Sequence, residues 1–220
     1  MNRLRLYHYW RSTSSWRVRW AMAHKGLVPE LVHVSLLDGE SESPAHRTRN
    51  PLGYVPVLEF LEEKDPTRRY LVESLPIIEF LEETFPANPL LPKDPRDRAH
   101  VRALAETINA GVQPIQNLTV QIHLAPESDP DHAAKRKAWA AHWIMNGLEA
   151  YEKLAAPRAG KFSFGDAPTL ADLALVPQLY GAIRNDVSFA HLPTVTRAYE
   201  NAIRTEAYRA SEPERFKPAP

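Results

Sequence analysis

Hydroxyl and guanidinium side chains gather in one short segment near the N-terminus, Arg11–Arg19, whose sequence is RSTSSWRVR. Strand-forming residues 4–9 precede this segment and helix-forming residues 16–25 follow it, so the hydroxyl groups lie where a predicted strand gives way to a predicted helix. The first N–H groups of a helix have no partner within the helix, and the helix dipole favours negative charge at that end. The segment is therefore predicted to bind an anion.

The composition restricts the partners of this segment. Lys plus Arg equal Asp plus Glu at 27 each, which argues against nucleic acid or an anionic membrane as a partner recognised by bulk charge. The chain has no cysteine, so disulfides, thiolate metal sites and a cysteine nucleophile are excluded, and any sulfur chemistry must come from a ligand. No histidine pair has the spacing of a zinc motif, so we expect no metal.

The start of the chain and its hydropathy bear on location. The residues Met1-Asn2-Arg3-Leu4 lead directly into a predicted strand rather than into a signal peptide, and there is no apolar run of about 18 residues. We therefore expect a soluble, cytoplasmic protein. Hydrophobic residues make up 44% of the 220 residues, enough for the cores of one domain or two small ones.

The first 85 residues have the pattern of a small mixed sheet with helices. Apolar alternation predicts strands at 4–9 and 31–34, and the helix at 16–25 between them is stopped by Gly26, which together form a βαβ unit. Two short apolar runs separated by turn residues predict an antiparallel hairpin of strands at 57–61 and 70–72.

Two further segments complete this half. Ser74 is expected to cap a helix that continues to Phe85. Residues 35–54 are rich in Ser, Glu, Asn, Gly and Pro and lack periodicity, so we expect a mobile excursion there. The first domain therefore reads βαβ, loop, ββα.

Four prolines within residues 86–95 oppose both helix and sheet, so this segment is predicted to be an interdomain linker. Beyond it the apolar residues recur at helical spacing, and the tail 211–220 is expected to be frayed. The predicted organisation is a domain at 1–85, a linker at 86–95 and an all-helical domain at 96–220. The predicted helices of the second domain cover roughly 96–122, 132–155, 169–184 and 194–207.

This order of elements, with a hydroxyl cluster opening the first helix, resembles the cytosolic glutathione transferases. The segment Ser12–Arg19 is similar to the zeta-class signature S-S-C-S-W-R-V-R, which is found in maleylacetoacetate isomerases. The resemblance implies an α/β plus all-α fold, with a thioredoxin-like N-terminal domain (βαβ-ββα) and an all-helical C-terminal domain. Further matching segments are Asn50-Pro51, Val55–Leu58, Glu73-Ser74, Ile77–Glu83, Gln113–Leu118 and Gly165–Asp172.

The resemblance also implies an activity. We expect glutathione as the cofactor of a cis–trans isomerase, whose thiolate adds to an activated double bond of a small dicarboxylate, lets the resulting single bond rotate, and leaves. Maleylpyruvate isomerase, which the pair Trp10-Arg11 would also fit, another glutathione transferase activity, and a non-catalytic glutathione-binding or interaction protein remain alternatives. The family further implies a homodimer and a place in aromatic amino-acid catabolism.

The expected thiolate-stabilising group is the Ser12 hydroxyl. Lowering a thiol pKa by about two units from ~8.5 requires roughly 2.7 kcal/mol. A helix terminus supplies only about 0.3–1 kcal/mol, whereas hydrogen bonds to a charged group contribute about 1.5–3 kcal/mol. Ser12, helped by neighbouring N–H groups, must therefore supply most of the effect.

The neighbours of Ser12 receive separate roles. Thr13, Ser14 and Arg11 complete the predicted catalytic cluster, while Ser15 is expected to cap the helix and to touch the cofactor. Ser14 stands where the class usually has cysteine. Other classes of the family hold the thiol with a tyrosine at the end of the first strand, but we interpret Tyr7 and Tyr9 as core or interface residues.

The remaining predicted glutathione contacts come from three segments. By resemblance, Val55 and Pro56 form a cis peptide that exposes backbone to the cysteinyl group of glutathione. Glu73 and Ser74 lie at a helix start suited to the γ-glutamyl group, although the class usually has glutamine at position 73. Gln113 and Asn117, four residues apart, are expected to share a helix face, and the resemblance implies that this face is turned toward glutathione and the substrate.

Two arginines are expected to receive substrate carboxylates, because a guanidinium suits bidentate carboxylate recognition. By resemblance they are Arg11, next to the thiol site, and Arg184, late in the helical domain. We interpret Arg17 and Arg19 as structural residues that link the first helix to the second domain. The hairpin at 62–69 is longer than is usual in the family.

Overall fold

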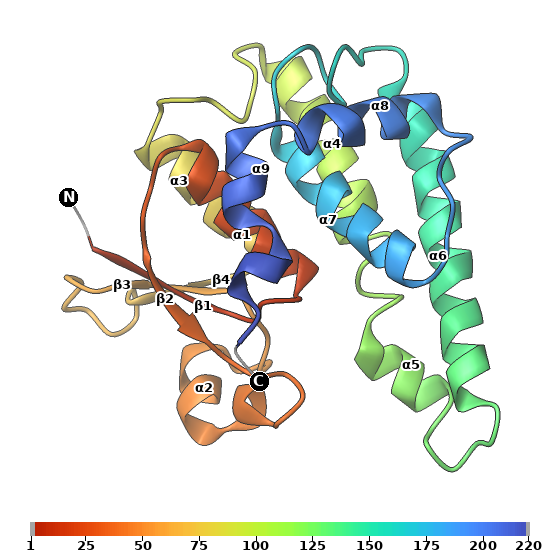
Figure 1. The fold of residues 1–220 in the computed structure, drawn as a ribbon. Helices are drawn as coiled ribbons and strands as arrows, with labels where there is room; N and C mark the ends of the chain where they lie inside the picture. The colour runs from red at the N-terminus through yellow and green to blue at the C-terminus, as the bar shows by residue number, and fades with distance from the viewer. Residues whose placement is uncertain (1–2, 219–220) are drawn as a thin grey trace. The chain divides into compact units, whose positions relative to one another are not determined.

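The computed structural model describes residues 3–218, and the chain divides into two compact units. The first unit comprises the chain up to Pro89 together with the residues from Thr205 onward, and the second is Leu90–Arg204 (Figure 1). The C-terminal residues thus belong with the N-terminal unit, which corrects the expectation that they lie in the helical domain. The two units are described separately below.

A four-stranded sheet in the order β2-β1-β3-β4 forms the centre of the first unit. Strand β1 pairs in parallel with β2 and antiparallel with β3, and β3 pairs antiparallel with β4. This mixed sheet confirms the predicted thioredoxin-like arrangement. The strands are β1 (Leu4–His8), β2 (Glu30–His33), β3 (Val57–Phe60) and β4 (Tyr70–Val72).

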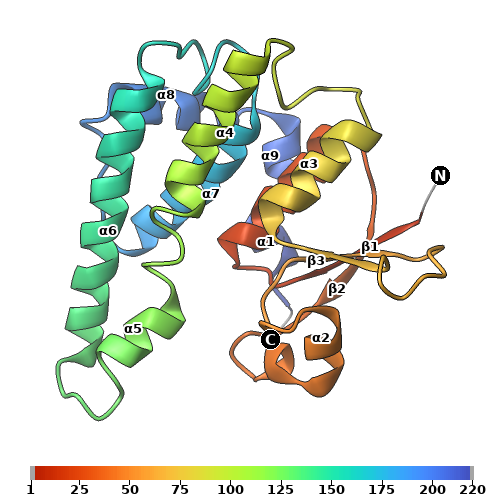
Figure 2. The ribbon, with the colours of Figure 1, turned by 180° about the vertical axis from the view of Figure 1, so that it is seen from behind.

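Helices cover both faces of this sheet. Helices α1 and α3 lie on one face, α2 lies on the other, and α9 packs against α1 (Figures 1 and 2). Leu6 of β1, Trp20 of α1 and Ile77 of α3 have no exposed surface, and the Trp20 ring lies 5.9 Å from the Tyr208 ring of α9. The helical elements of this unit are α1 (Thr13–His24), η1 (Glu40–Glu42), α2 (Pro44–Arg49), α3 (Ser74–Thr84), α9 (Glu206–Ser211) and η2 (Pro213–Phe216).

The segment 35–54 is structured, which corrects the expectation of a mobile excursion. Ser43 caps α2 by accepting a hydrogen bond from His46 N–H, and Pro44 occupies the first helical position. His46 and Asn50 are buried. The six residues of α2 are too few to produce a helical apolar pattern, so periodicity could not reveal them.

The C-terminal residues 211–218 are also ordered, although a frayed tail was expected. Ser211 and Pro213 are buried, and Trp16 Nε1 of α1 donates to Ser211 Oγ at 3.1 Å. The rings of Trp16 and Tyr208 are 5.4 Å apart. The last two residues of the tail lie outside the described residues.

The second unit is a bundle of helices in which α4 packs against α7 and α6, and α7 and α6 pack against α8. Its core includes Leu104, Ile144, Leu148 and Leu173, all with no exposed surface. No helix within the described part of the chain is long and apolar enough to span a membrane. The helices are α4 (Pro95–Asn109), α5 (Leu118–Leu124), α6 (His132–Ala155), α7 (Leu170–Arg184) and α8 (Pro193–Ala202).

Two predicted helices are each divided in the structure. The predicted helix 96–122 is interrupted at 110–117, where Pro114 lacks the N–H that a continuous helix requires. The predicted helix 194–207 separates into α8 and α9, because Thr205 starts a new helix by accepting from Tyr208 N–H.

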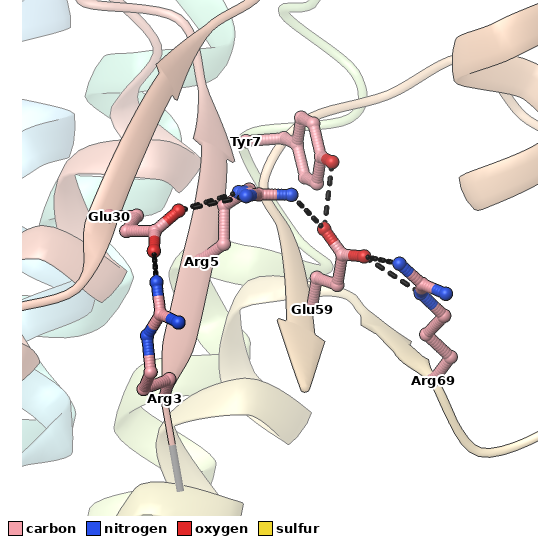
Figure 3. A network of polar contacts seen from close by, with 6 residues as sticks. All are labelled: Arg3, Arg5, Tyr7, Glu30, Glu59 and Arg69. Atoms are coloured by element: carbon pink, nitrogen blue, oxygen red, sulfur yellow. Dashed lines mark hydrogen bonds and ion pairs between the residues drawn. The ribbon is translucent and has the colours of Figure 1, made fainter. Parts of the chain in front are cut away.

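A network of charges crosses the face of the sheet that carries Tyr7 (Figure 3). Glu59 on β3 accepts hydrogen bonds from Tyr7 Oη at 2.8 Å, Arg5 Nη1 at 3.0 Å and Arg69 Nε at 2.7 Å. Only 1% of the Glu59 side chain is exposed. Burial alone would raise the pKa of Glu59, but these three donors outweigh it and hold the pKa below its usual value.

We expect Glu59→Gln to lower the free energy of unfolding by about 1–3 kcal/mol, because it leaves the Tyr7 and arginine donors without their charged acceptor. The depressed pKa of Glu59 in the folded state means that its contribution is present above pH 4.5, the ordinary pKa, and is lost as the pH falls through the folded pKa. Denaturant unfolding as a function of pH measures both effects.

The matched control is Glu30→Gln, since Glu30 binds Arg3 and Arg5 but is 40% exposed. Its loss of stability should be smaller. Equal losses in the two variants would contradict the structural role assigned to Glu59.

Candidate active site

Ser12 is the N-cap of α1. Its Oγ accepts a hydrogen bond from Ser15 N–H at 3.1 Å, and its carbonyl accepts from Trp16 N–H at 2.9 Å. Its own N–H donates to the Tyr9 carbonyl at 3.1 Å, which closes the turn between β1 and α1. The expectation that Ser15 caps this helix is therefore wrong, because Ser15 is the donor of the capping bond.

The cap leaves donors available at the start of α1. A hydroxyl has one O–H donor and two acceptor lone pairs, so Ser12 can accept from Ser15 and still donate to an anion. Helix geometry leaves the N–H groups of Thr13 and Ser14 without an intrahelical partner, and within the described chain no other group accepts from them. The first turn contains no acidic residue. These features fit a thiolate or another small anion.

The neighbouring side chains differ in accessibility. Ser15 has no exposed surface, and its Oγ accepts from Tyr9 N–H at 3.4 Å, so this hydroxyl faces the protein interior. Thr13, Ser14 and Arg11 are partly exposed. The Arg11 guanidinium lies 5.5 Å from the centre of the Trp10 ring, beside the turn.

Tyr7 in β1 and Tyr9, which directly follows β1, both pack in the interior of the first unit. Tyr7 donates to Glu59, and burial is the main cause that raises the Tyr7 pKa. Tyr9 is 6% exposed and belongs to an apolar cluster with Val34, Val55 and Val57. These contacts favour the interpretation of Tyr7 and Tyr9 as core residues.

The Val55–Pro56 peptide is cis, as predicted. The residue before it is fixed by two side chains of the α2 segment, because the Tyr54 carbonyl contacts His46 Nε2 at 3.0 Å and accepts from Asn50 Nδ2 at 3.1 Å. The sequence motif identified Asn50, but nothing in the pattern identified His46. Together they determine the path of the backbone into Val55.

Glu73 and Ser74 form the start of α3, but not as expected. Glu73 occupies the N-cap position with φ of 69°, and Ser74 is the first helical residue, so Ser74 is not the cap. A side chain at positive φ is strained, and such positions concentrate at functional sites. Ser74 Oγ accepts from Arg17 Nη1 at 3.2 Å, which leaves its O–H free to donate.

In the second unit, Gln113 and Asn117 do not share a helix face. Gln113 lies in the irregular segment after α4, whereas Asn117 is the N-cap of α5 and accepts from Thr119 N–H at 3.1 Å. Gln116, from the same motif, donates to Gln178 Oε1 at 3.1 Å. Arg184 is the last residue of α7, with its guanidinium 5.7 Å from the Tyr180 ring.

Two other features of the described chain lie outside the predicted site. Among residues 3–218, no group of three histidine or acidic side chains could hold a metal ion. A hollow of about 500 Å³ lies at the β3–β4 hairpin and contains none of the predicted site residues. Its lining residues are Phe60, Glu62, Glu63, Arg68, Tyr70, Leu71 and Phe80.

Two family descriptions match the chain, Glutathione S-transferase, N-terminal domain, over residues 6–89 and Glutathione S-transferase, C-terminal domain, over residues 133–209. Maleylacetoacetate isomerase of Rhizobium meliloti (strain 1021) is 40% identical over 214 residues, covering 97% of each chain. The chain therefore belongs to the glutathione transferase family. Within that family, its similarity over nearly the full length is to the zeta class and its maleylacetoacetate isomerases.

Solved structures of maleylacetoacetate isomerase and of a maleyl pyruvate isomerase are similar to this chain over nearly its full length. Maleylacetoacetate isomerase from Anaeromyxobacter dehalogenans 2CP-1 with bound GSH has a TM-score of 0.87 and 45% identity, covering 99% of this chain and 98% of that chain. Another structure of that protein holds dicarboxyethyl glutathione and citrate, with a TM-score of 0.86, 44% identity and coverage of 99% and 94%. A bacterial maleyl pyruvate isomerase of the zeta class has a TM-score of 0.85 and 37% identity, with coverage of 95% and 96%.

We expect Glu73→Gly to raise the free energy of unfolding by about 1 kcal/mol, because glycine adopts positive φ without strain. The same variant should weaken glutathione binding about tenfold, because it removes the carboxylate that the resemblance leads us to expect as the acceptor for the ligand ammonium. Thermal unfolding and calorimetric titration with glutathione measure the two effects.

Two controls separate backbone from side chain. Glu73→Gln keeps the strained backbone and should gain no stability, whereas Asp186→Gly relieves a φ of 56° and should leave glutathione binding unchanged. The assignment of strain to Glu73 is contradicted if the glycine and glutamine variants unfold at the same temperature.

Proposed function

We propose that this protein is a glutathione-dependent cis–trans isomerase of the maleylacetoacetate type. The observation that carries the proposal is the Ser12 cap, which orients a hydroxyl at the N-terminus of α1 while leaving its O–H free to donate. Bound glutathione supplies a thiolate that adds to an activated double bond and later leaves, so that the intervening single bond can rotate.

The residues of the first unit stabilise the thiolate and hold the cofactor. The Ser12 O–H and the N–H groups of Thr13 and Ser14 donate to the sulfur, and together they exceed what the helix dipole alone contributes. Backbone at Val55 before Pro56 pairs with the cysteinyl group. Ser74 donates to the γ-glutamyl carboxylate, and Glu73 accepts from its ammonium.

Other assignments rest on the family resemblance. Ser15, with its hydroxyl turned inward, serves the site by fixing the turn rather than by touching glutathione through its side chain. Gln113 and Asn117 are assigned to glutathione, and Arg11 and Arg184 to substrate carboxylates, which guanidinium groups bind in bidentate fashion. The citrate and the dicarboxyethyl group bound to the Anaeromyxobacter relative support a dicarboxylate substrate.

The second candidate is maleylpyruvate isomerase, because the similarity to a solved maleyl pyruvate isomerase is nearly as high. It differs from the first only in substrate, and the same donors would act in both. Rates with maleylacetoacetate, maleylpyruvate and a chlorodinitrobenzene distinguish these two reactions from a general transferase. Absence of glutathione binding would leave only a non-catalytic scaffold role.

We further propose a homodimer in the cytoplasm that acts in aromatic amino-acid catabolism. Support for a partner surface comes from α5, which buries none of its residues. Its apolar side chains are between 37% and 49% exposed, and they are Leu118, Val120, Ile122 and Leu124.

We expect Ser12→Ala to raise the pKa of the bound glutathione thiol by about one to two units and to lower kcat/KM by about 10-fold to 100-fold. This is the effect of losing one hydrogen bond to a charged group, about 1.5–3 kcal/mol. Titration of the thiolate ultraviolet absorbance in the complex and steady-state kinetics provide the two measurements.

Because Ser12 also caps α1, its removal should cost about 1 kcal/mol of stability. Asp94→Ala is the matched control, because Asp94 is the N-cap of α4. Its Oδ1 accepts hydrogen bonds from the N–H groups of Arg96 and Asp97. The control should lose similar stability and keep its activity. Near-normal turnover in Ser12→Ala would refute the assignment.

A further inference from the structure

A buried arginine of α1 holds the turn that carries Ser12. Arg19 is 4% exposed, and its Nη2 donates to the Trp10 carbonyl at 2.9 Å while its Nη1 donates to the Tyr9 carbonyl at 3.3 Å. These are neighbouring carbonyls, immediately before Arg11 and Ser12. The planar fork of a guanidinium suits two adjacent acceptors, which an ammonium would contact singly.

Arg19 and Ser12 share an acceptor. The Tyr9 carbonyl receives the Ser12 N–H at 3.1 Å and Nη1 of Arg19 at 3.3 Å. Displacing the guanidinium would therefore remove one of the two hydrogen bonds that hold the Tyr9 carbonyl. The other bond, from Ser12 N–H, helps to set the position of the Ser12 hydroxyl. A shift of about 1 Å at a reacting group can cost about 100-fold in rate.

The C-terminal segment, defined here as Tyr208–Lys217, fixes the opposite side of the guanidinium. Arg19 Nε donates to the Ser211 carbonyl at 3.2 Å, and the Phe216 ring lies 4.7 Å from the guanidinium carbon. The same segment continues to the turn, because Lys217 Nζ lies 5.7 Å from the Trp10 ring. Arg19 thus links α1 to residues that were expected in the second domain, but those residues belong to the first unit.

The remaining partner of Arg19 is a neutral histidine. His8 Nδ1 is 3.1 Å from Arg19 Nη1, and it must accept this bond because a guanidinium has no acceptor. Burial first, and the Arg19 charge second, lower the pKa of His8 to about 3, which keeps it neutral. Among residues 3–218, therefore, carbonyls, an imidazole and an aromatic ring are the partners of this cation, and no carboxylate hydrogen-bonds to it.

An environment without a carboxylate makes burial of the Arg19 cation energetically unfavourable. Burial lowers the pKa of Arg19 to about 9, and a buried cation that lacks an ionic partner is costly compared with an apolar side chain of similar volume. What an apolar side chain could not supply is the pair of hydrogen bonds to the turn.

We propose that Arg19 is a positioning residue for the thiol site, and that the C-terminal segment completes this site by holding Arg19. The inference rests on the proposed role of Ser12 and extends it to residues about 200 positions away in the sequence. Arg19 acts through the turn and contacts neither glutathione nor substrate.

The decisive variant is Arg19→Lys, which keeps the charge and removes the fork. We expect the pKa of the bound glutathione thiol to rise by about half a unit to one unit and kcat to fall about tenfold, with the glutathione dissociation constant changing less than about twofold. Thiolate titration in the complex, steady-state kinetics and thermal unfolding are measured together. Arg69→Lys is the matched control, because Arg69 binds Glu59 on the hairpin and should leave the thiol pKa and kcat unchanged.

The C-terminal segment is tested at Phe216. Phe216→Leu removes the aromatic face beneath the guanidinium while keeping apolar volume, and it should change the thiol pKa and kcat in the same direction as Arg19→Lys, but less. Phe216→Tyr keeps the aromatic face and should therefore have the thiol pKa and kcat of the wild-type protein. A general loss of packing would not follow this order.

The outcomes separate cleanly. The proposal is overturned if Arg19→Lys and Phe216→Leu bind glutathione with a wild-type thiol pKa, even if they unfold at lower temperature, since that would be a structural effect alone. If Arg19→Lys does not fold, Phe216→Leu against Phe216→Tyr decides. An ordinary thiol pKa in the wild-type complex, or no change in Ser12→Ala, would refute the proposed function and this inference together. If the thiol pKa changes in Ser12→Ala but not in Arg19→Lys, the inference about Arg19 is refuted and the proposed function is not.

Discussion

The cap of α1 is the interaction on which the rest of the first unit depends. A single hydroxyl, on Ser12, accepts from Ser15 and closes the helix start, and this capping bond restricts the hydroxyl to one orientation with its proton directed elsewhere. The β1–α1 turn, the buried Ser15 and the Arg19 fork all act on that one geometry. A cap that contributes about 1 kcal/mol to folding thereby also prepares a donor for a thiolate.

Most of the secondary structure that depends on local residue spacing was predicted correctly. The alternation in β1 and the hairpin, the stop of α1 at Gly26 with φ of 70°, and the long helix α6 follow from side-chain spacing and from the permissive backbone of glycine. The mixed sheet and the family follow from combining these elements with the serine motif.

What failed depends on contacts that spacing does not contain. Helix α2 is too short for a periodic signal, and the C-terminal residues look frayed until Ser211 and Phe216 meet Arg19 and Trp16. The choice of Ser12 over Ser15 as cap depends on backbone dihedrals at one residue, within a run of four hydroxyl side chains that all qualify by type. The pair of carbonyls that Arg19 contacts, those of Tyr9 and Trp10, likewise depends on three-dimensional contacts that residue spacing does not contain.

The central claim is that the Ser12 hydroxyl donates to the sulfur of glutathione, and a crystal structure of the complex measures this most directly. The account predicts a distance from Ser12 Oγ to the sulfur within hydrogen-bond reach, about 3.5 Å or less, with Ser12 Oγ still accepting from Ser15 N–H. A sulfur beyond that reach, or one hydrogen-bonded to Tyr7 or Tyr9 instead, would contradict the account.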